Sequence, residues 1–142
     1  MPVRTAEAEW KGDLPKGSGR MKTQTGSFEG AYSAGSRFEE ATGTNPEELI
    51  AAAHAGCFSM AFANKLAQAG FTPDSVETTA NVHLEKTDAG MTVTRIDLVT
   101  DATVPGIDKD QFDEIAQDAK ATCPISRLLS PGAEITLNAT LA

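Results

Sequence analysis

One stretch constrains the fold of this chain more than any other: residues 46–70 form an apolar run with the signals of a single long helix. Asn45 is placed as the N-cap, Pro46 suits the first helical position, and Glu48 stands at the capping-box spacing. After Glu48 few large polar side chains interrupt the run, namely His54, Asn64, Lys65 and Gln68. A helix that is apolar on most of its circumference is buried on all sides. At about 37 Å, from ~1.5 Å per residue, it needs a wrapping sheet or a second chain to cover it.

Length and charge narrow the class of protein. The chain has 142 residues, and we expect residues 1–142 to form a single domain. A net charge of −8 and a pI near 4.7 argue against binding to nucleic acid or to anionic membranes. The long helix is not a membrane span, because its polar residues leave no clean apolar stretch of about 20 residues. Residues 1–10 hold charges and no apolar signal-peptide core, so we expect a cytoplasmic protein.

The order of the elements predicts the fold class. Alternating hydrophobicity predicts strands within residues 5–11, 20–25, 76–84, 91–103 and 135–141. Asp108 caps a second helix, which must break at Pro124 because proline lacks an N–H and clashes with the preceding turn. A short helical piece then runs to Leu129. Strands, helix, hairpin, helix and strand follow one another without a βαβ repeat, which predicts an α+β fold with a mostly antiparallel sheet.

The two cysteines, Cys57 and Cys123, are the first candidates for chemistry. They lie 66 positions apart, which matches no zinc or CxxC spacing, and with only two histidines a metal site is not expected. In a reducing cytoplasm such a pair points to a catalytic or redox-active role rather than to a structural disulfide. Each cysteine could equally be a small core residue. Cys123 precedes Pro124 and could cap the next helix, where amide groups would favour a thiolate.

Three further residues each allow two interpretations. His54 lies three positions before Cys57 on the same helix face, which suggests a Cys–His hydrolase. A buried core histidine is the interpretation that we favour for it. Glu47 is not needed by the capping box, but it could simply complement the helix dipole. Arg37 lies between Ser36 and an apolar residue, and a solvated surface arginine is its ordinary interpretation.

Several segments of the chain together resemble one known family. Residues 43–49, with Thr44-Asn45-Pro46-Glu47, and residues 54–60, with the Gly56-Cys57-Phe58 step, resemble the signature of the osmotically inducible protein C family, OsmC. Its sister group is the organic hydroperoxide resistance proteins, Ohr. Further similar segments occur in the expected order at residues 36–39, 70–73, 104–108 and 119–126. The resemblance covers essentially the whole chain, and the context of residue 37 resembles the OsmC branch more than the Ohr branch.

The resemblance implies a fold and an activity. It implies an OsmC/Ohr-like fold in which a mostly antiparallel sheet wraps long central helices in an intertwined homodimer. It also implies a thiol peroxidase that reduces organic hydroperoxides in preference to hydrogen peroxide, with no metal or flavin cofactor and with a lipoyl-type dithiol as reductant. By matching motif, Cys57 is the peroxidatic thiolate and Cys123 the resolving thiol. Arg37 is the activating guanidinium, and Glu47 orients it.

Helix geometry adds an expectation about assembly. Glu47 and Cys57 lie ten positions apart on one helix, which separates them by about 15 Å and turns them roughly 80° apart. One arginine can scarcely serve both within a single chain, so we expect a second chain to complete the site. Two alternatives to the peroxidase stay open from the sequence. One is the hydrolase that uses Cys57 and His54, and the other is a non-enzymatic thiol redox sensor.

Overall fold

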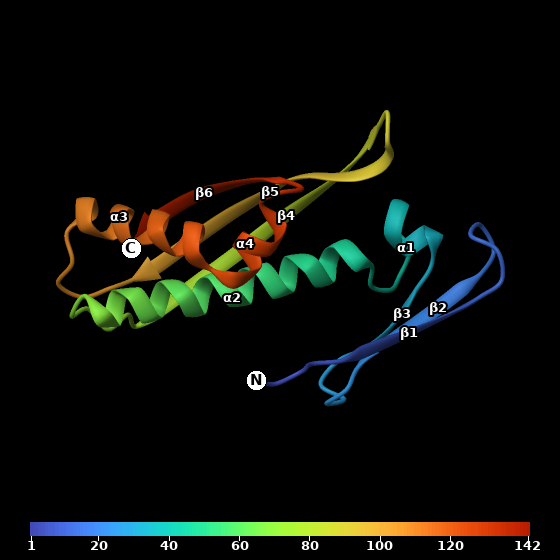
Figure 1. Cartoon of the computed structure of the whole chain (residues 1–142), viewed down its shortest axis with the longest axis horizontal. Coiled ribbons are helices and arrows are strands. Elements are labelled where there is room, and N and C mark those ends of the chain that lie inside the picture. Colours follow the sequence, from blue (N-terminus) through green and yellow to red (C-terminus); the bar gives the residue numbers. More distant parts are fainter. The chain divides into compact units, whose positions relative to one another are not determined.

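The computed structural model describes residues 1–142 and divides them into two compact units, residues 1–49 and 50–142. The expectation of a single domain stays a prediction. In the first unit three antiparallel strands follow one another in the order β1-β2-β3, and a short helix comes next (Figure 1). These elements are β1 (Ala6–Lys11), β2 (Ser18–Thr23), β3 (Glu29–Tyr32) and α1 (Ala34–Phe38).

The long helix α2 spans Pro46–Gln68, close to its expected range. Asn45 caps it as predicted, because its Oδ1 accepts a hydrogen bond from the Glu48 N–H at 2.8 Å. The other half of the expected capping box differs: the Glu48 carboxylate accepts from the Thr44 hydroxyl at 2.7 Å. Gly70 follows the helix with φ +95, the left-handed conformation expected of a residue that ends a helix. The boundary between the two compact units falls inside α2, after Leu49.

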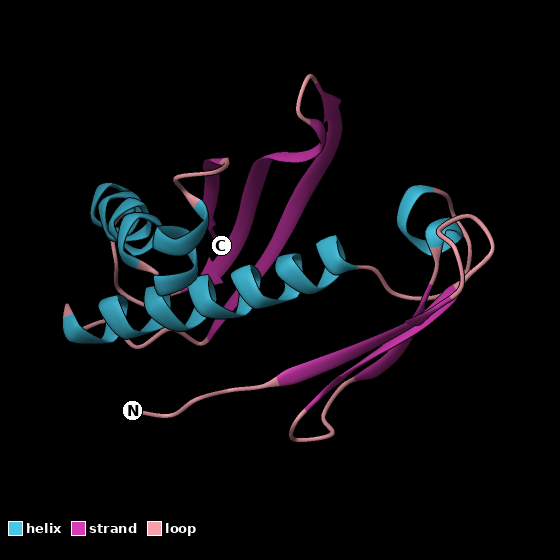
Figure 2. Ribbon diagram, turned by 45° about the vertical axis from the view of Figure 1, so that its right-hand side comes forward, coloured by secondary structure: helices cyan, strands magenta, loops and turns pink.

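The second unit pairs a sheet with helices. In the order β4-β5-β6, β4 and β5 form the predicted hairpin, whereas β6 runs parallel to β5. Figures 1 and 2 show α2, α3 and α4 on one side of this sheet. The chain breaks between α3 and α4 at Pro124, as predicted. The elements are β4 (Ser75–Thr87), β5 (Gly90–Thr103), α3 (Lys109–Thr122), α4 (Pro124–Leu129) and β6 (Glu134–Leu141).

The core of the second unit lies between this sheet and the helices. Alternate residues of β5 face the helices, and Ile96 and Leu98 are fully buried there. Phe62 of α2 meets Phe112 of α3 edge to face, with the ring centroids 5.3 Å apart. Such aromatic burial supplies a large share of the hydrophobic stabilisation of a small core. The core therefore fixes α2, whose middle carries Cys57, on the sheet.

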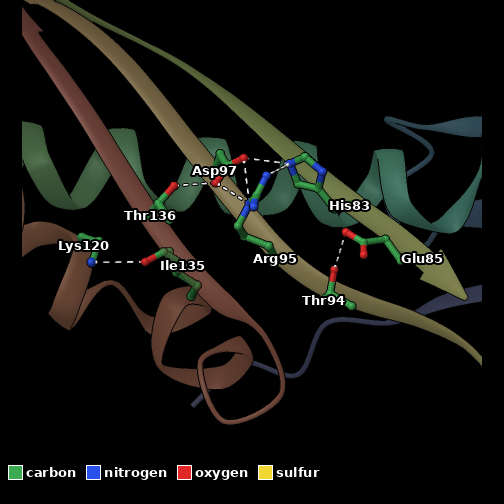
Figure 3. Close-up of polar contacts among 8 residues, drawn as sticks. All are labelled: His83, Glu85, Thr94, Arg95, Asp97, Lys120, Ile135 and Thr136. Carbon is green, nitrogen blue, oxygen red and sulfur yellow. Dashed lines mark hydrogen bonds and ion pairs between the residues drawn. The ribbon is translucent and has the colours of Figure 1, made fainter. Parts of the chain in front are cut away.

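A polar cluster occupies the opposite face of the same sheet. Figure 3 shows Asp97 of β5 at its centre, with hydrogen bonds and an ion pair to residues of β4, β5 and β6. The Thr136 hydroxyl donates to Asp97 at 2.6 Å, the His83 ring lies 2.7 Å from it, and Arg95 approaches to 3.0 Å. The first two hydrogen bonds, Thr136 before His83, hold the pKa of Asp97 below its ordinary value. The cluster thus joins all three strands through one carboxylate.

One face of α2 is not covered by the second unit. Ala52, Ala53 and Gly56 are exposed, and Met60 keeps 76% of its surface accessible. The opposite face carries the buried Phe58 and its neighbours along the helix. The second unit therefore covers the apolar helix on one side only. None of the helices combines the length and the hydrophobicity that a membrane crossing requires.

Candidate active site

The two thiols meet in the second unit. Cys57 lies in the middle of α2 and is half-buried, while Cys123 is the N-cap of α4 and is fully buried. The Cys123 thiol donates to the Cys57 sulfur at 3.0 Å, and both cysteines are free. A disulfide has an S–S length of about 2.0 Å, so a movement of about 1 Å would join them. A two-electron oxidation of this pair can therefore end in a disulfide.

The surroundings of Cys57 pull its pKa in both directions. Burial is the largest influence and raises the pKa of Cys57, and the neighbouring Cys123 thiol raises it further. A hydrogen bond from the backbone of Ile125 lowers it. Ile125 belongs to the first turn of α4, so the amides of that helix favour the thiolate of Cys57. From the sequence we expected these amides to favour a thiolate at Cys123. The Cys123 side chain makes no capping hydrogen bond.

In the first unit, Arg37 and Glu47 form a forked ion pair. Arg37 Nη2 lies 2.6 Å from Glu47 Oε1, and Arg37 Nε lies 3.2 Å from each carboxylate oxygen. Glu47 is 9% exposed, and the Arg37 side chain is 36% exposed. Two neighbouring nitrogens of the guanidinium donate to one planar carboxylate, which fixes the orientation of the Arg37 side chain. Neither ordinary interpretation, a dipole-complementing acid or a freely solvated arginine, describes this pair.

The turn between α1 and α2 holds this pair in place. Ser33 and Ser36 form a reciprocal capping box at the start of α1, and the Ser36 hydroxyl donates to the Thr44 carbonyl at 2.7 Å. The Asn45 amide returns a hydrogen bond to the Ser36 carbonyl at 3.0 Å. The end of α1, with Arg37, is thereby tied to the start of α2. Local side-chain contacts of this kind satisfy the free backbone groups at helix ends.

A hollow of about 270 Å³ lies beside Arg37 in the same unit. Trp10 and Tyr32 contribute aromatic rings to its wall, with centroids 5.3 Å apart, and Leu14 adds an aliphatic surface. Ser33, Ala34 and Arg37 complete the lining. Its surface is mainly apolar, with the Arg37 guanidinium at one side. Such a hollow suits a small molecule that has an apolar group and a polar end. No motif in the sequence identifies Trp10 and Tyr32 as residues of a binding site.

His54 binds a partner other than the neighbouring cysteine. Its Nε2 lies 2.7 Å from the Ser126 hydroxyl, and both residues are buried. Burial lowers the pKa of His54, which keeps the ring neutral. Cys57 has Cys123 as its side-chain partner, so the structure does not form a Cys57–His54 dyad. Ser126 was not among the residues singled out in the sequence, although it lies three positions after Cys123.

Metal ligands do not gather around this site. No group of three or more His, Cys, Asp or Glu side chains comes together anywhere in the chain as metal ligands would. The second unit brings together two thiols and a neutral imidazole, and the first unit holds an arginine–glutamate pair.

Sequence relatives agree on one family. A family model described as OsmC-like protein matches residues 39–138. Peroxiredoxin OsmC of Escherichia coli (strain K12) is 51% identical over 136 residues, which cover 95% of this chain and 94% of that protein. Organic hydroperoxide resistance protein-like 1 of Staphylococcus saprophyticus is 30% identical over 122 residues, with 85% and 86% covered.

Solved structures share the fold over nearly the whole chain. An OsmC-like protein of unknown function from Vibrio cholerae superposes with a TM-score of 0.77 at 20% identity, covering 98% of this chain and 99% of that one. The organic hydroperoxide resistance protein OhrB of Bacillus subtilis gives a TM-score of 0.72 at 23% identity, with 96% and 98% covered. These likenesses confirm the predicted OsmC/Ohr-like α+β fold. Together with the family model and the sequence relatives, they establish that this chain belongs to the OsmC-like protein family.

Proposed function

We propose that this protein is a cysteine-based peroxidase that reduces organic hydroperoxides to alcohols through Cys57 and Cys123. The observation that carries the proposal is the 3.0 Å approach of two free thiols. The Cys57 thiolate attacks the distal peroxide oxygen, the alcohol leaves, and Cys57 becomes a sulfenic acid. The Cys123 thiol then condenses with it, a disulfide forms, and water leaves. Two electrons from an external dithiol restore both thiols.

Membership of the family supports the peroxidase class directly. The relative that is 51% identical is named a peroxiredoxin, and the more distant relatives are named for resistance to organic hydroperoxides. A thiol peroxidase needs one reactive cysteine, and a second cysteine within reach protects it from overoxidation. This chain has both in contact, and it has no other cysteine. The sequence-based prediction of a cysteine-dependent peroxidase agrees with the names of its relatives.

Arg37 is the cation that we assign to the Cys57 thiolate. Within the second unit the burial of Cys57 raises its pKa, so a reactive thiolate needs a positive charge from elsewhere. Glu47 holds the Arg37 fork, and Glu47 and Cys57 are ten residues apart on the continuous helix α2. That spacing corresponds to about 15 Å along the helix. We therefore propose that the Arg37–Glu47 pair of one subunit serves Cys57 of another.

The uncovered face of α2 supports a homodimer. It presents Ala52, Ala53, Gly56 and the highly exposed Met60. Small residues allow close approach of a second helix, and packing against that helix would remove the exposed Met60 side chain from water. A second copy of α2 packed on this face would bury the helix on all sides, as its composition predicts.

The hollow beside Arg37 supports the choice of organic hydroperoxides as substrates. Trp10, Leu14 and Tyr32 offer apolar surface for an alkyl or aryl group next to the guanidinium. Hydrogen peroxide has no group to place there, and so it would gain no binding free energy from that surface. We further propose a lipoyl-type dithiol as reductant and a cytoplasmic location, where both cysteines stay reduced between turnovers.

Turnover with a dithiol tests the proposal. The protein should consume cumene hydroperoxide with dihydrolipoamide faster than it consumes hydrogen peroxide, and Cys57→Ser should abolish both reactions. A protein whose thiols oxidise once but never turn over with any dithiol would instead be a redox sensor. Ester hydrolysis that disappears in both Cys57→Ser and His54→Ala would support the hydrolase, although His54 is engaged by Ser126.

A further inference from the structure

A second buried contact accompanies the thiol pair. His54 and Ser126 are 0% and 3% exposed, and His54 Nε2 lies 2.7 Å from Ser126 Oγ. His54 precedes Cys57 by three positions on α2, and Ser126 follows Cys123 by three positions at the start of α4. Residues three apart in a helix share a face. The two helices are thus joined by two neighbouring contacts, one between sulfurs and one between an imidazole and a hydroxyl.

The His54–Ser126 hydrogen bond is the one polar contact that His54 makes. His54 Nδ1 is buried and has no hydrogen-bond partner. A neutral imidazole has one nitrogen that donates and one that accepts, and a hydroxyl can do either, so Nε2 and Ser126 Oγ can form this bond with either one as the donor. Removing either partner would leave the other buried without a partner, which is costly.

The short helix α4 depends on contacts of this kind. It has six residues, and Ser126 is the only one of them that is fully buried. A helix this short has little stability of its own, so packing decides where it lies. Leu128 points into solvent, while Ile125 and Leu129 are only partly buried. Cys123 is the N-cap of this helix, and its position therefore follows that of α4.

We propose that His54 and Ser126 are positioning residues that hold α4 on α2, so that the Cys123 thiol reaches the Cys57 sulfenic acid before a second peroxide does. This inference rests on the proposed peroxidase function. In the productive step the Cys123 sulfur bonds to the Cys57 sulfur, the S–O bond breaks, and water leaves. In the competing step a second hydroperoxide oxidises the sulfenic acid to a sulfinic acid and leaves as the alcohol. The hydrogen bond favours the first step by keeping the resolving thiol in place.

Ser126→Ala tests this assignment. Rapid mixing of the reduced protein with cumene hydroperoxide should show that the first oxidation of Cys57 slows much less than disulfide formation, because α4 acts on the attacking thiolate only through the Ile125 amide. Disulfide formation should slow by about tenfold, the scale expected when a reacting group loses its alignment. Intact-mass measurement should show a matching rise in the fraction of Cys57 that reaches sulfinic acid at a given peroxide excess. Ser130→Ala is the matched control and should behave as wild type. Ser130 is the exposed C-cap residue of the same helix.

Two comparisons separate positioning from general loosening of the fold. Leu66→Ala truncates a buried side chain elsewhere on α2 and lowers stability without touching the contact. At temperatures where Leu66→Ala and Ser126→Ala are equally far below their melting points, only Ser126→Ala should slow disulfide formation. His54→Leu should slow it too, and the double variant should be no slower than the single variants, because both remove the same contact.

The outcomes are distinct. Disulfide formation at the wild-type rate in Ser126→Ala, equal slowing in Leu66→Ala, or multiplied effects in the double variant would each overturn the positioning role. Failure of wild-type Cys57 to form a sulfenic acid at all would instead overturn the peroxidase function on which the inference rests.

Discussion

At the scale of one residue, the proposed role of Arg37 depends on the orientation of its side chain. Its guanidinium is held by Glu47, so the charge has a fixed direction. Replacing Arg37 with Ala should raise the pKa of Cys57 and lower the thiolate fraction at neutral pH. We expect peroxidase activity to fall roughly 100-fold, as for the loss of one aligned charged donor. Arg37→Lys should recover only part of it, because an ammonium cannot reproduce the fork.

The rate of Cys57 alkylation against pH measures this effect. The inflection of the Arg37→Ala profile should move to higher pH than that of the wild type. Arg20→Ala is the control, because Arg20 also forms an ion pair with a glutamate, Glu29, but on the exposed surface of the first sheet. If the Arg37→Ala profile coincided with the wild-type profile, Arg37 would not be the residue that activates Cys57.

Residue-level reasoning from the sequence succeeded where the chemistry was local. Glu47 stood out because Glu48 already met the need for a cap, and the structure gives Glu47 a partner of its own. The expectation for Cys123 was less accurate. A cysteine before proline suggested a capped thiolate, but the amide of Ile125 turns toward Cys57 instead. The sequence could not show this, because the direction of a helix end depends on how that helix packs.

At the scale of elements, Asp97 gives the sheet a pH dependence. Hydrogen bonds from Thr136 and His83 lower the pKa of Asp97 from its ordinary 3.8. A carboxyl group with a lowered folded-state pKa stabilises the fold above its unfolded pKa, and this contribution is lost as the pH falls through the folded value. Asp97→Asn should therefore lower the free energy of unfolding at pH 7. The difference from wild type should shrink as the pH falls below 3.8.

Urea unfolding between pH 7 and pH 2.5 checks this prediction. Asp101→Asn is the matched control, since Asp101 lies on the same strand four residues away and makes no side-chain hydrogen bond. It should change stability little at any of these pH values. If Asp97→Asn matched Asp101→Asn at pH 7, the cluster in Figure 3 would contribute nothing to the fold.

The elements that sequence reasoning predicted are those with local signals. The caps and length of α2, the β4–β5 hairpin and the break at Pro124 all follow from neighbouring residues. The parallel pairing of β6 with β5 was not predicted, because strand direction depends on contacts far apart in the chain. Burial of α2 on all sides stays a prediction, because the second unit covers only one face and leaves Met60 exposed on the other.

At the scale of the whole molecule, the proposed dimer makes each site depend on two chains. Cys57→Ser and Glu47→Ala proteins should each be nearly inactive alone. Refolded together to exchange subunits, they should regain activity, because a mixed dimer places an intact Cys57 opposite an intact Glu47 at one of its two sites. For random exchange, half of the dimers are mixed and each has one working site. The recovered activity should therefore approach about a quarter of the wild-type value.

A second mixture controls for exchange itself. Cys57→Ser and Cys123→Ser proteins carry their changes in residues that meet within one chain, so no mixed dimer restores a site. That mixture should stay without turnover. If the first mixture also stayed inactive while mass measurement showed mixed dimers, Glu47 would act on its own chain and the shared site would be wrong.

The central claim is that oxidation begins at Cys57 and ends in a Cys57–Cys123 disulfide. Intact-mass and peptide analysis after one equivalent of cumene hydroperoxide, with a sulfenic-acid trap present, tests it most directly. We predict a disulfide in the wild type, a trapped sulfenic acid at Cys57 in Cys123→Ser, and no rapid oxidation in Cys57→Ser. A sulfenic acid trapped at Cys123 in Cys57→Ser, formed as fast as the wild-type disulfide, would contradict the account.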